Sequence, residues 1–291
     1  MVIIYYSINK VLFGHLEKIF PDQYLLAYGS KRDNNFDYFK DIFKVSFHSQ
    51  RHLFIYNTSP ANLFVSVISK LLGSKITFHI HDPKPHSGIL NPVIYLIQLF
   101  QLLFSDNIIV FDPLLIRTTF SYYPFISKKK LKVFPHGKPE FNSVKVNLNN
   151  NKVNFGFFGR NMPYKNVDKF LSLSTKFSEG IFNIYGKGYC GIFKLNQNVN
   201  VIDKFIDNDL YYSYMVAVDY IVLPYRDISF SGIVNDAISL GKKMIVSKYI
   251  MNKYTHPLMI LLSKFDNPIK QKKPNINNGG WQAYAKNLKK L

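Results

Sequence analysis

Two turns in the second half of the chain carry residues that suit the binding of a phosphorylated ligand. In "FGFFGRNMPYKNVDKF" an apolar strand ends at Gly159, Arg160 follows at once, and Lys165 stands where a helix begins. In "DYIVLPYRDISFSGIVNDAISLG" a second strand leads through Ser231 and Gly232 into another helix. Cations and the unpaired amides at a helix start both bind anions. Two such turns in one domain favour a diphosphate.

The second turn also offers a carboxylate. Ser231 is a good N-cap residue, and the amides of Ser231, Gly232 and Ile233 are expected to point toward the ligand. Asp236 lies about one helical turn further on, where its carboxylate could accept two hydrogen bonds from a ribose diol. Two plainer interpretations stay open at this point: a solvated basic turn, and an ordinary capped helix with a surface aspartate.

The elements that position these turns alternate between short apolar strands and longer helical patterns. Such an alternation predicts an α/β protein with parallel sheets covered by helices on both faces. Expected strands cover residues 2–7, 24–29, 53–57, 75–81, 107–111, 132–136, 153–159, 181–186, 199–205, 219–224 and 242–248. Expected helices cover 60–72, 91–104, 112–121, 164–178, 208–217 and 232–240.

A polar, asparagine-rich stretch divides this alternation into two doubly wound, Rossmann-like domains. We expect an N-terminal acceptor-side domain over 1–137, a linker over 138–152 and a donor-binding domain over 153–275. A basic helix over 276–291 completes the chain. Because ligands of open parallel sheets lie beyond the carboxyl ends of the strands, function is expected in the loops that face a cleft between the domains.

The composition restricts the class of protein. The formal net charge is +19 over 291 residues, with 17 Lys and Arg against 9 Asp and Glu in residues 1–150, and 20 against 9 in the rest. Both halves therefore attract polyanions: phosphorylated substrates, anionic lipids or nucleic acid. The single cysteine, Cys190, excludes a disulfide framework and fits a reducing compartment. The N-terminus has no signal-peptide pattern, and the apolar run 89–104 is too interrupted to predict a membrane span.

Residues 153–248 resemble the donor-binding domain of retaining GT-B glycosyltransferases of the family-4-like type, also known as glycosyl transferases group 1. The resemblance rests on "FFGRNMPYKNVDKFL", on "IYGKG" followed by "VIDKFIDNDLYYSYMVAVDYIVLPY", and on "SGIVNDAISLGKKMIV". In the first half "TFHIHDPKPHSG" and "VFPHGKPE" resemble the acceptor-side histidine loop and its exit into the linker. The resemblance spans nearly the whole chain and is weak before residue 75.

The resemblance implies a GT-B fold and a nucleotide-sugar donor, most commonly a UDP-sugar. It implies that Gly159, Arg160 and Lys165 form the diphosphate site with the amides of residues 231–233, and that Asp236 contacts the ribose. It also implies that the loop at Phe205 and Ile206 covers the nucleobase. His81 is expected to approach the reacting carbon of the transferred sugar.

One position departs from the family pattern. The family has a Glu-x7-Glu pair, and Asp236 stands at its second acid, but Ile228 occupies the position of the first. Asp227, one residue away, is the candidate to contact the donor sugar in its place. The identity of the donor sugar and the role of Asp227 therefore stay open.

The histidines allow two interpretations. His79, His81 and His86 lie within eight residues, and on an alternating strand His79 and His81 share a face. A packed strand-end histidine is the alternative to a functional one, most of all at His79. No His, Cys and Asp cluster has metal-ligand spacing, so we expect no metal and no cofactor beyond the nucleotide-sugar co-substrate.

The sequence hypothesis is glycosyl transfer with retention to a saccharide or lipid-linked acceptor, in bacterial surface polysaccharide biosynthesis. In the family picture the leaving diphosphate takes the acceptor proton, so no carboxylate pair is needed. We expect a cytoplasmic protein, and contact of residues 94–104 and 121–132 with an anionic membrane surface is a further hypothesis. The alternatives are a catalytically impaired GT-B binding subunit, a GT-B epimerase and a nucleic-acid-binding protein; for the last, no basic helical stripe or known motif is present.

Overall fold

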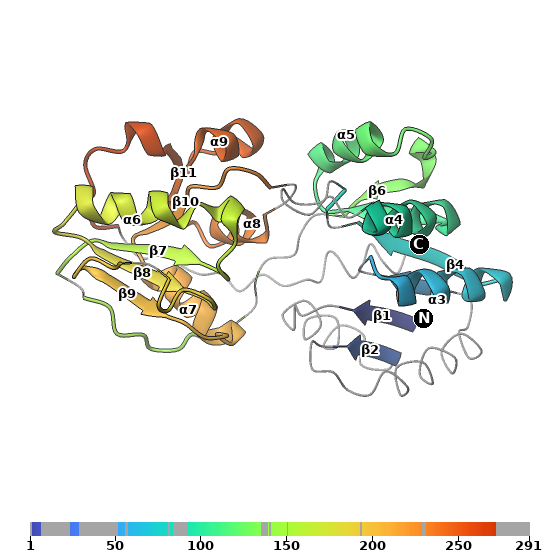
Figure 1. The fold of residues 1–291 in the computed structure, drawn as a ribbon, viewed down its shortest axis with the longest axis horizontal. Helices are drawn as coiled ribbons and strands as arrows, with labels where there is room; N and C mark the ends of the chain where they lie inside the picture. The colour runs from blue at the N-terminus through green and yellow to red at the C-terminus, as the bar shows by residue number, and fades with distance from the viewer. Residues whose placement is uncertain are drawn as a thin grey trace. The chain divides into compact units, whose positions relative to one another are not determined.

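The computed structural model describes residues 2–6, 24–28, 52–55, 58–80, 82–83, 92–134, 139, 141–149, 151–192, 194–228 and 231–271. The described residues fall into two compact units, one up to residue 134 and one from residue 139 to 271. Each unit is built on a six-stranded parallel sheet (Figure 1). The C-terminal helix predicted at 276–291 lies outside the described residues.

The first unit has the strand order β2-β1-β3-β4-β5-β6. Its strands are β1 (Val2–Tyr6), β2 (Tyr24–Tyr28), β3 (His52–Ile55), β4 (Lys75–His79), β5 (Asn107–Val110) and β6 (Leu131–Val133). Its helices are α3 (Pro60–Leu71), α4 (Pro92–Phe104) and α5 (Pro113–Tyr122), and the short 3-10 helix η1 (Lys128–Lys130) precedes β6.

Two helices of this unit begin with the same sequence device, an oxygen-bearing cap followed by proline. Ser59 Oγ accepts from the Asn62 amide at 3.1 Å before α3, and Asp112 Oδ1 accepts from the Leu114 amide at 2.8 Å before α5. Proline fits the first helical position because its missing N–H would have no partner there. The short connections after β3 and β5 are thereby fixed at the start of each helix.

The second unit has the strand order β12-β11-β10-β7-β8-β9, with every described pairing parallel. Its strands are β7 (Asn154–Phe158), β8 (Ile181–Tyr185), β9 (Val199–Ile202), β10 (Tyr220–Leu223), β11 (Met244–Val246) and β12 (Met259–Leu261). Its helices are α6 (Val167–Lys176), α7 (Asn208–Ala217), α8 (Gly232–Ser239) and α9 (Lys248–Tyr254), with 3-10 turns η2 (Pro163–Lys165) and η3 (Leu262–Lys264).

Aromatic rings fill the core on both sides of β7. Phe155 stacks on Phe182 with ring centroids 4.4 Å apart, and Phe158 stacks on Tyr185 at 4.9 Å. All five residues of β7 are buried, as expected of a central strand covered on both faces. The apolar run "NFGFF" therefore fixes β7 at the centre of the sheet, with its carboxyl end at Gly159.

The stretch 141–149, predicted as part of a linker, contains no helix or strand and packs along α7. The Asn142 amide donates to Asp209 Oδ1 at 3.0 Å, and the Val144 amide donates to Ser213 Oγ at 2.8 Å. Among the described residues, α9, β12 and the 3-10 helices η1 and η3 are present beyond the predicted set. The other predicted helices and strands of both units are found with shifts of a few residues at their ends.

Asp219, at the amino end of β10, joins the start of β7 and the segment at residues 270–271 through hydrogen bonds. It is 3% exposed, and its carboxylate accepts from the Asn154 amide at 2.7 Å, the Gln271 amide at 2.9 Å and Lys270 Nζ at 3.0 Å. Removing the carboxylate would leave the two backbone amides without their acceptor, whereas Lys270 Nζ would keep the Lys152 carbonyl at 2.7 Å.

We predict that Asp219→Ala lowers the free energy of unfolding by about 2–4 kcal/mol, the cost of leaving one buried and one half-buried amide unsatisfied. Urea unfolding followed by circular dichroism measures it. Asp266→Ala is the matched control, because the carboxylate of Asp266 is 76% exposed in its ion pair with Lys176. Exposed pairs contribute about 1 kcal/mol or less. Equal losses of unfolding free energy in the two variants would contradict the stabilising role assigned to the Asp219 hydrogen bonds.

Candidate functional site

The carboxyl ends of β7 and β10 lie side by side at the centre of the second sheet. From β7 the strand order runs outward through β8 and β9 on one side and through β10, β11 and β12 on the other, so the direction of winding reverses here. Ligands of doubly wound sheets bind at this reversal, outside the carboxyl ends of the strands. Both turns singled out in the sequence, 159–165 and 224–231, begin at this point.

Gly159 occupies a position that allows no side chain. Its φ is +98°, and a Cβ built there would overlap Lys165 Nζ. Gly186, at the end of β8, packs directly on the Gly159 carbonyl, and a Cβ on Gly186 would overlap that carbonyl. Glycine is required at both positions because two backbones and an ammonium group meet here.

Lys165 is a buried cation at this point of closest approach. It is 7% exposed, its Nζ donates to the Phe158 carbonyl at 3.1 Å, and it lies 5.8 Å from the centroid of the Tyr225 ring. Burial, followed by the repulsion of Arg160, lowers the pKa of Lys165 to about 7. The interpretation of this segment as a wholly solvated basic turn is therefore wrong for Lys165.

Arg160 complements Lys165. Its side chain is exposed, and it makes no hydrogen bond or ion pair with any other residue of the described part of the chain. A buried lysine and an exposed arginine thus follow β7 within six residues. An anionic ligand at this turn could bind the arginine directly and would favour the charged form of the lysine.

The turn after β7 is tied to the loop after β10. The Arg226 amide donates to the Tyr164 carbonyl at 2.8 Å, and the Arg226 guanidinium donates to Asn166 Oδ1 at 2.8 Å. Asn166 Nδ2 in turn donates to the Pro224 carbonyl at 3.2 Å. The two loops therefore form one hydrogen-bonded unit, which the sequence alone did not indicate.

The start of α8 provides two amides beside this unit. Ser231 caps the helix, with Oγ accepting from the Val234 amide at 3.3 Å, and the Ser231 amide itself donates to Tyr254 Oη at 2.9 Å. That amide, expected to face a ligand, is thus engaged within the protein. The amides of Gly232 and Ile233 have no hydrogen-bond partner among the described residues, and a Cβ on Gly232 would meet nothing within 4 Å.

The two predicted anion-binding elements meet through Ile233. Its Cδ1 lies 3.9 Å from a Cβ built on Gly159, so the first turn of α8 adjoins the turn after β7. The structure therefore brings together Gly159, Lys165 and Ile233, which are separated by up to 74 residues in the sequence.

Asp236 is buried rather than on the surface. It is 7% exposed, and Tyr212 Oη of α7 lies 3.5 Å from its Oδ2. Burial raises the pKa of Asp236 to about 7, although the hydrogen bond from Tyr212 opposes the shift. The surface-aspartate interpretation is wrong, and a group that titrates near neutrality stands at the predicted ribose position.

Asp227 and Ile228 are held by α9. Asp227 is half-buried and its Oδ1 accepts from Tyr249 Oη at 3.1 Å. Ile228 is 5% exposed, and its carbonyl accepts from Tyr249 Oη at 3.0 Å and Lys253 Nζ at 2.7 Å. An apolar residue at 228 thus packs in the core while the neighbouring carboxylate stays accessible.

The loop after β8 contacts the turn after β7 and is itself held by Asp203. Asp203, just after β9, accepts from the amides of Cys190 at 2.6 Å, Gly188 at 2.5 Å and Tyr189 at 3.0 Å. These hydrogen bonds, that of Cys190 first, lower the pKa of Asp203 to about 2. Tyr189 Oη donates to the Gly159 carbonyl at 2.8 Å. The Asp203 carboxylate therefore restrains the turn after β7 through this loop.

The predicted nucleobase loop follows Asp203 directly. Phe205 is 62% exposed, whereas Ile206 is 8% exposed and packs into the unit. An exposed phenyl ring beside the carboxyl end of β9 offers a stacking surface for a flat ligand.

The two candidate histidines belong to the first unit. His81 lies outside the described residues. His79 is 3% exposed and meets the Phe111 ring edge-on at 4.0 Å, as a core histidine does.

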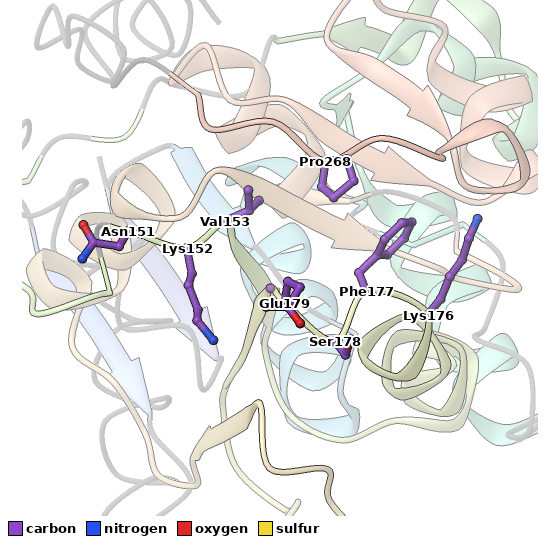
Figure 2. A pocket seen from close by; sticks show the side chains of 9 residues that line it. Asn151, Lys152, Val153, Lys176, Phe177, Ser178, Glu179 and Pro268 are labelled. Carbon is purple, nitrogen blue, oxygen red and sulfur yellow. The ribbon is translucent and has the colours of Figure 1, made fainter.

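A pocket of about 510 Å³ lies at the other end of the same sheet (Figure 2). It is lined by residues that flank the amino ends of β7 and β8, namely Asn151, Lys152, Val153, Lys176, Phe177, Ser178, Glu179, Gly180 and Pro268. Because the sheet reversal places ligands at the carboxyl ends, this pocket is separate from the candidate site.

In the described part of the chain, no group of three or more His, Cys, Asp or Glu side chains has the arrangement of a metal site. Likewise, none of the described helices combines the length and the apolar character needed to span a bilayer.

Solved structures with the same architecture are found across most of the chain. Anabaena Alr3699/HepE in complex with UDP-glucose superposes with a TM-score of 0.64 at 13% identity, covering 88% of this chain and 83% of that one. Sucrose-phosphate synthase from Thermosynechococcus elongatus gives 0.61 at 13% identity, covering 85% and 81%. The UDP-GlcNAc 2-epimerase from Methanocaldococcus jannaschii gives 0.62 at 9% identity, covering 100% and 99%.

The chain has the GT-B fold. At these identities the likeness establishes the fold alone. No protein-family model and no curated protein sequence matches the chain. The GT-B fold predicted from the motifs is thus confirmed, while the roles of the individual site residues stay predictions.

The sequence did not indicate the residues that restrain the loops of the candidate site through hydrogen bonds. The tyrosines and lysine of α9 and the Asp203 carboxylate contact backbone groups of the site loops. The one available signal was Ser247 before "KYIMNKY", an N-cap ahead of a short amphipathic run. Contacts between loops distant in sequence have no local signature.

We predict that Gly159→Ala and Gly232→Ala differ sharply in stability. The first puts a Cβ on Lys165 Nζ at a positive φ, which should cost about 1–3 kcal/mol of unfolding free energy. The second adds a Cβ in open space at the start of α8, where alanine changes stability by about 1 kcal/mol or less. Urea midpoints of the two variants test this, and equal midpoints would contradict the close approach at Gly159.

Proposed function

We propose that the protein is a glycosyltransferase that takes its sugar from a nucleotide-diphosphate sugar, with a UDP-sugar as the expected donor. The observation that carries the proposal is that Lys165 and Ile233, in the first turn of α8, both lie against Gly159 at the sheet reversal of a GT-B fold unit, with Arg160 next in the chain. The UDP-glucose of the HepE structure and the UDP-GlcNAc bound to the Neisseria meningitidis epimerase support a UDP-sugar donor.

In the proposed reaction the diphosphate binds between the turn after β7 and α8. The bond from the anomeric carbon to the β-phosphate oxygen breaks, and the acceptor oxygen bonds to that carbon on the same face. The proton of the acceptor hydroxyl passes to the leaving diphosphate oxygen. Arg160, Lys165 and the amides of Gly232 and Ile233 would stabilise the growing negative charge of that leaving group.

The nucleoside half of the donor would lie over α7 and α8. Phe205 would stack against the base, Ile206 would anchor that loop, and Asp236 would accept from the ribose hydroxyls. Because the pKa of Asp236 is about 7, the ionised fraction of its carboxyl group increases as the pH rises through 7. The ionised form accepts the stronger hydrogen bonds, so the ribose contact would be favoured at higher pH. Tyr212, beside the carboxyl group, would hold its orientation.

The sugar and acceptor sides of the proposal depend on fewer described residues. Asp227, half-buried and oriented by Tyr249, would contact the transferred sugar in place of the glutamate expected at 228. His81 would approach the reacting carbon. The proposed acceptor is a saccharide, free or lipid-linked, and the proposed setting is bacterial surface polysaccharide biosynthesis in the cytoplasm.

Epimerisation of a UDP-sugar is the second candidate, because a UDP-GlcNAc 2-epimerase spans the whole chain in superposition. Product analysis separates the two. A transferase releases free UDP and moves the sugar to an acceptor or to water, whereas a 2-epimerase inverts the carbon adjacent to the anomeric carbon. A binding subunit that has lost catalysis would bind the donor and yield neither product.

We predict that the full chain binds UDP-sugars and that Arg160→Ala weakens this binding by about tenfold or more, the cost of losing charge-assisted hydrogen bonds to phosphate. Asp236→Ala should weaken it by a comparable factor through the ribose. Isothermal titration with UDP-, GDP- and other nucleotide sugars measures both.

Arg117→Ala is the matched control for these variants, since Arg117 is an exposed arginine of α5 in the other unit. Its affinity should equal that of the wild type. If no nucleotide sugar bound the wild type, or if all three variants behaved alike, the proposed donor site would be wrong.

We predict that the affinity for a UDP-sugar falls as the pH rises above about 7. Lys165 then loses its proton in the free protein, and binding must restore it, so the affinity decreases by up to tenfold per pH unit. Below about 7, protonation of Asp236 lowers the affinity from the other side. Burial keeps the pKa of neighbouring Tyr225 far above this window.

The two limbs of this pH profile are assigned by separate variants. Lys165→Met should remove the fall above pH 7, and Asp236→Asn should remove the fall below it. A UDP-sugar is used rather than UDP because a terminal phosphate itself titrates near 6. A profile unchanged in both variants would contradict the assignment.

A further inference from the structure

Helix α4 has two apolar faces, and only one of them covers the sheet. Ile97, Gln98, Gln101 and Leu102 are buried. The side chains that face solvent are apolar too: Leu96 is 49% exposed, Phe100 45%, Leu103 48% and Phe104 36%. Their spacing of four, three and one places them on one stripe of the helix. None of the thirteen residues from Pro92 to Phe104 is charged.

The end of α3, which packs on α4, also exposes apolar side chains. Helices α3 and α4 pack together and lead into the neighbouring parallel strands β4 and β5, so their carboxyl ends lie at the same edge of the sheet (Figure 1). The ion pair between Lys70 and Asp106, at 2.5 Å, joins these two ends. Leu71 is 79% exposed and Leu72 51% exposed there.

A lysine cluster borders this apolar area. Lys128–Lys130 form η1 directly before β6, and Lys130 Nζ lies 3.4 Å from the Leu103 carbonyl. The carboxylates within 92–134 are Asp106, which pairs with Lys70, and Asp112, which caps α5. Within 92–134, therefore, three lysines border the apolar area, and of these Lys130 lies near enough to Asp106 to help lower the pKa of that carboxyl.

We propose that this surface binds an anionic lipid bilayer. The name α4 surface is used below for the apolar residues Leu71, Leu72, Leu96, Phe100, Leu103 and Phe104 with the bordering lysines Lys128–Lys130. The apolar side chains would enter the boundary between headgroups and acyl chains, and the lysines would contact headgroup phosphates. The proposal concerns the first unit alone and does not depend on the donor site.

The dimensions of α4 favour contact in the plane of the bilayer. At about 1.5 Å per residue its thirteen residues extend about 20 Å, less than the roughly 30 Å of a hydrocarbon core. An uncharged apolar stripe with cations at one edge is the composition of a helix that lies at the interface.

Charge favours a lipid surface over a second copy of the chain as the occupant. A second copy brings the same net charge of +19 to the contact, whereas an anionic bilayer brings the opposite sign. Contiguous exposed apolar area of this kind is uncommon on proteins without a partner for it.

The test is co-sedimentation of the full chain with sucrose-loaded vesicles. We expect binding to phosphatidylcholine vesicles that contain about one third phosphatidylglycerol, weaker binding to pure phosphatidylcholine by about tenfold, and a further loss at high salt. Phe100→Ser with Leu103→Ser should reduce binding by about tenfold or more. Lys128→Glu with Lys129→Glu should do the same on anionic vesicles only.

Matched controls come from exposed residues of the second unit. Leu195 and Ile269 are 40% and 57% exposed, so Leu195→Ser with Ile269→Ser repeats the apolar change elsewhere. Lys169→Glu with Lys194→Glu repeats the charge change at two exposed lysines. Both control pairs should bind vesicles within about twofold of the wild type, and circular dichroism confirms that every variant is folded.

Two results would overturn the proposal. The first is control variants that lose as much vesicle binding as the test variants, which would mean that net charge and general hydrophobicity act without a defined surface. The second is a wild-type chain that binds no vesicles but forms a dimer in light scattering that Phe100→Ser with Leu103→Ser dissociates. The α4 surface would then be an interface between copies.

Discussion

The close approach of backbone to backbone at the end of β7 is the constraint on which the candidate site depends. Gly159 and Gly186 meet without side chains, and Lys165 fills the remaining space with its ammonium on the Phe158 carbonyl. Burying a cation there costs free energy, as the lowered pKa of Lys165 records. An anionic ligand would recover that cost by favouring the charged form. The same packing that destabilises the free cation would therefore favour the binding of an anion beside it.

The supports of this position come from elements that follow it in the chain. Asp203 holds three consecutive amides of the loop after β8, and Tyr189 of that loop holds the Gly159 carbonyl. Phe205 lies two residues beyond Asp203, so the proposed base-stacking loop and the turn after β7 are both restrained by Asp203. On the other side, Tyr249 and Tyr254 of α9 hold the loop before α8. The groups proposed to contact a ligand are thus few, and the groups that restrain them are more numerous.

The fold was predictable because parallel sheets covered on both faces need continuous apolar strands and amphipathic helices. "NFGFF" and "YIVL" show that pattern over every residue, and the cap-plus-proline signals at Ser59 and Asp112 mark helix starts. Gly159, Lys165 and Ile233 were predicted from turn chemistry, and the structure brings them together. The engagement of the Ser231 amide by Tyr254 was not predictable, because it depends on α9, seven residues long and followed by β12. A short element that packs against a loop has too little periodicity to be recognised from sequence.

The lysines that give the chain its positive charge differ in burial and therefore in what they do. Lys165 and Lys242 are 7% and 2% exposed, and both donate to backbone carbonyls at strand or helix ends, Lys242 to those of Val216 and Val218. Such buried lysines stabilise loops but contribute little to the field outside the protein. The lysines of η1 act in the opposite way, since Lys128 and Lys129 are exposed and their field reaches outward. A charge of +19 is therefore no single signal for nucleic acid or any other polyanion. Its meaning is local, and it differs between the sheet reversal of the second unit and the α4 surface of the first.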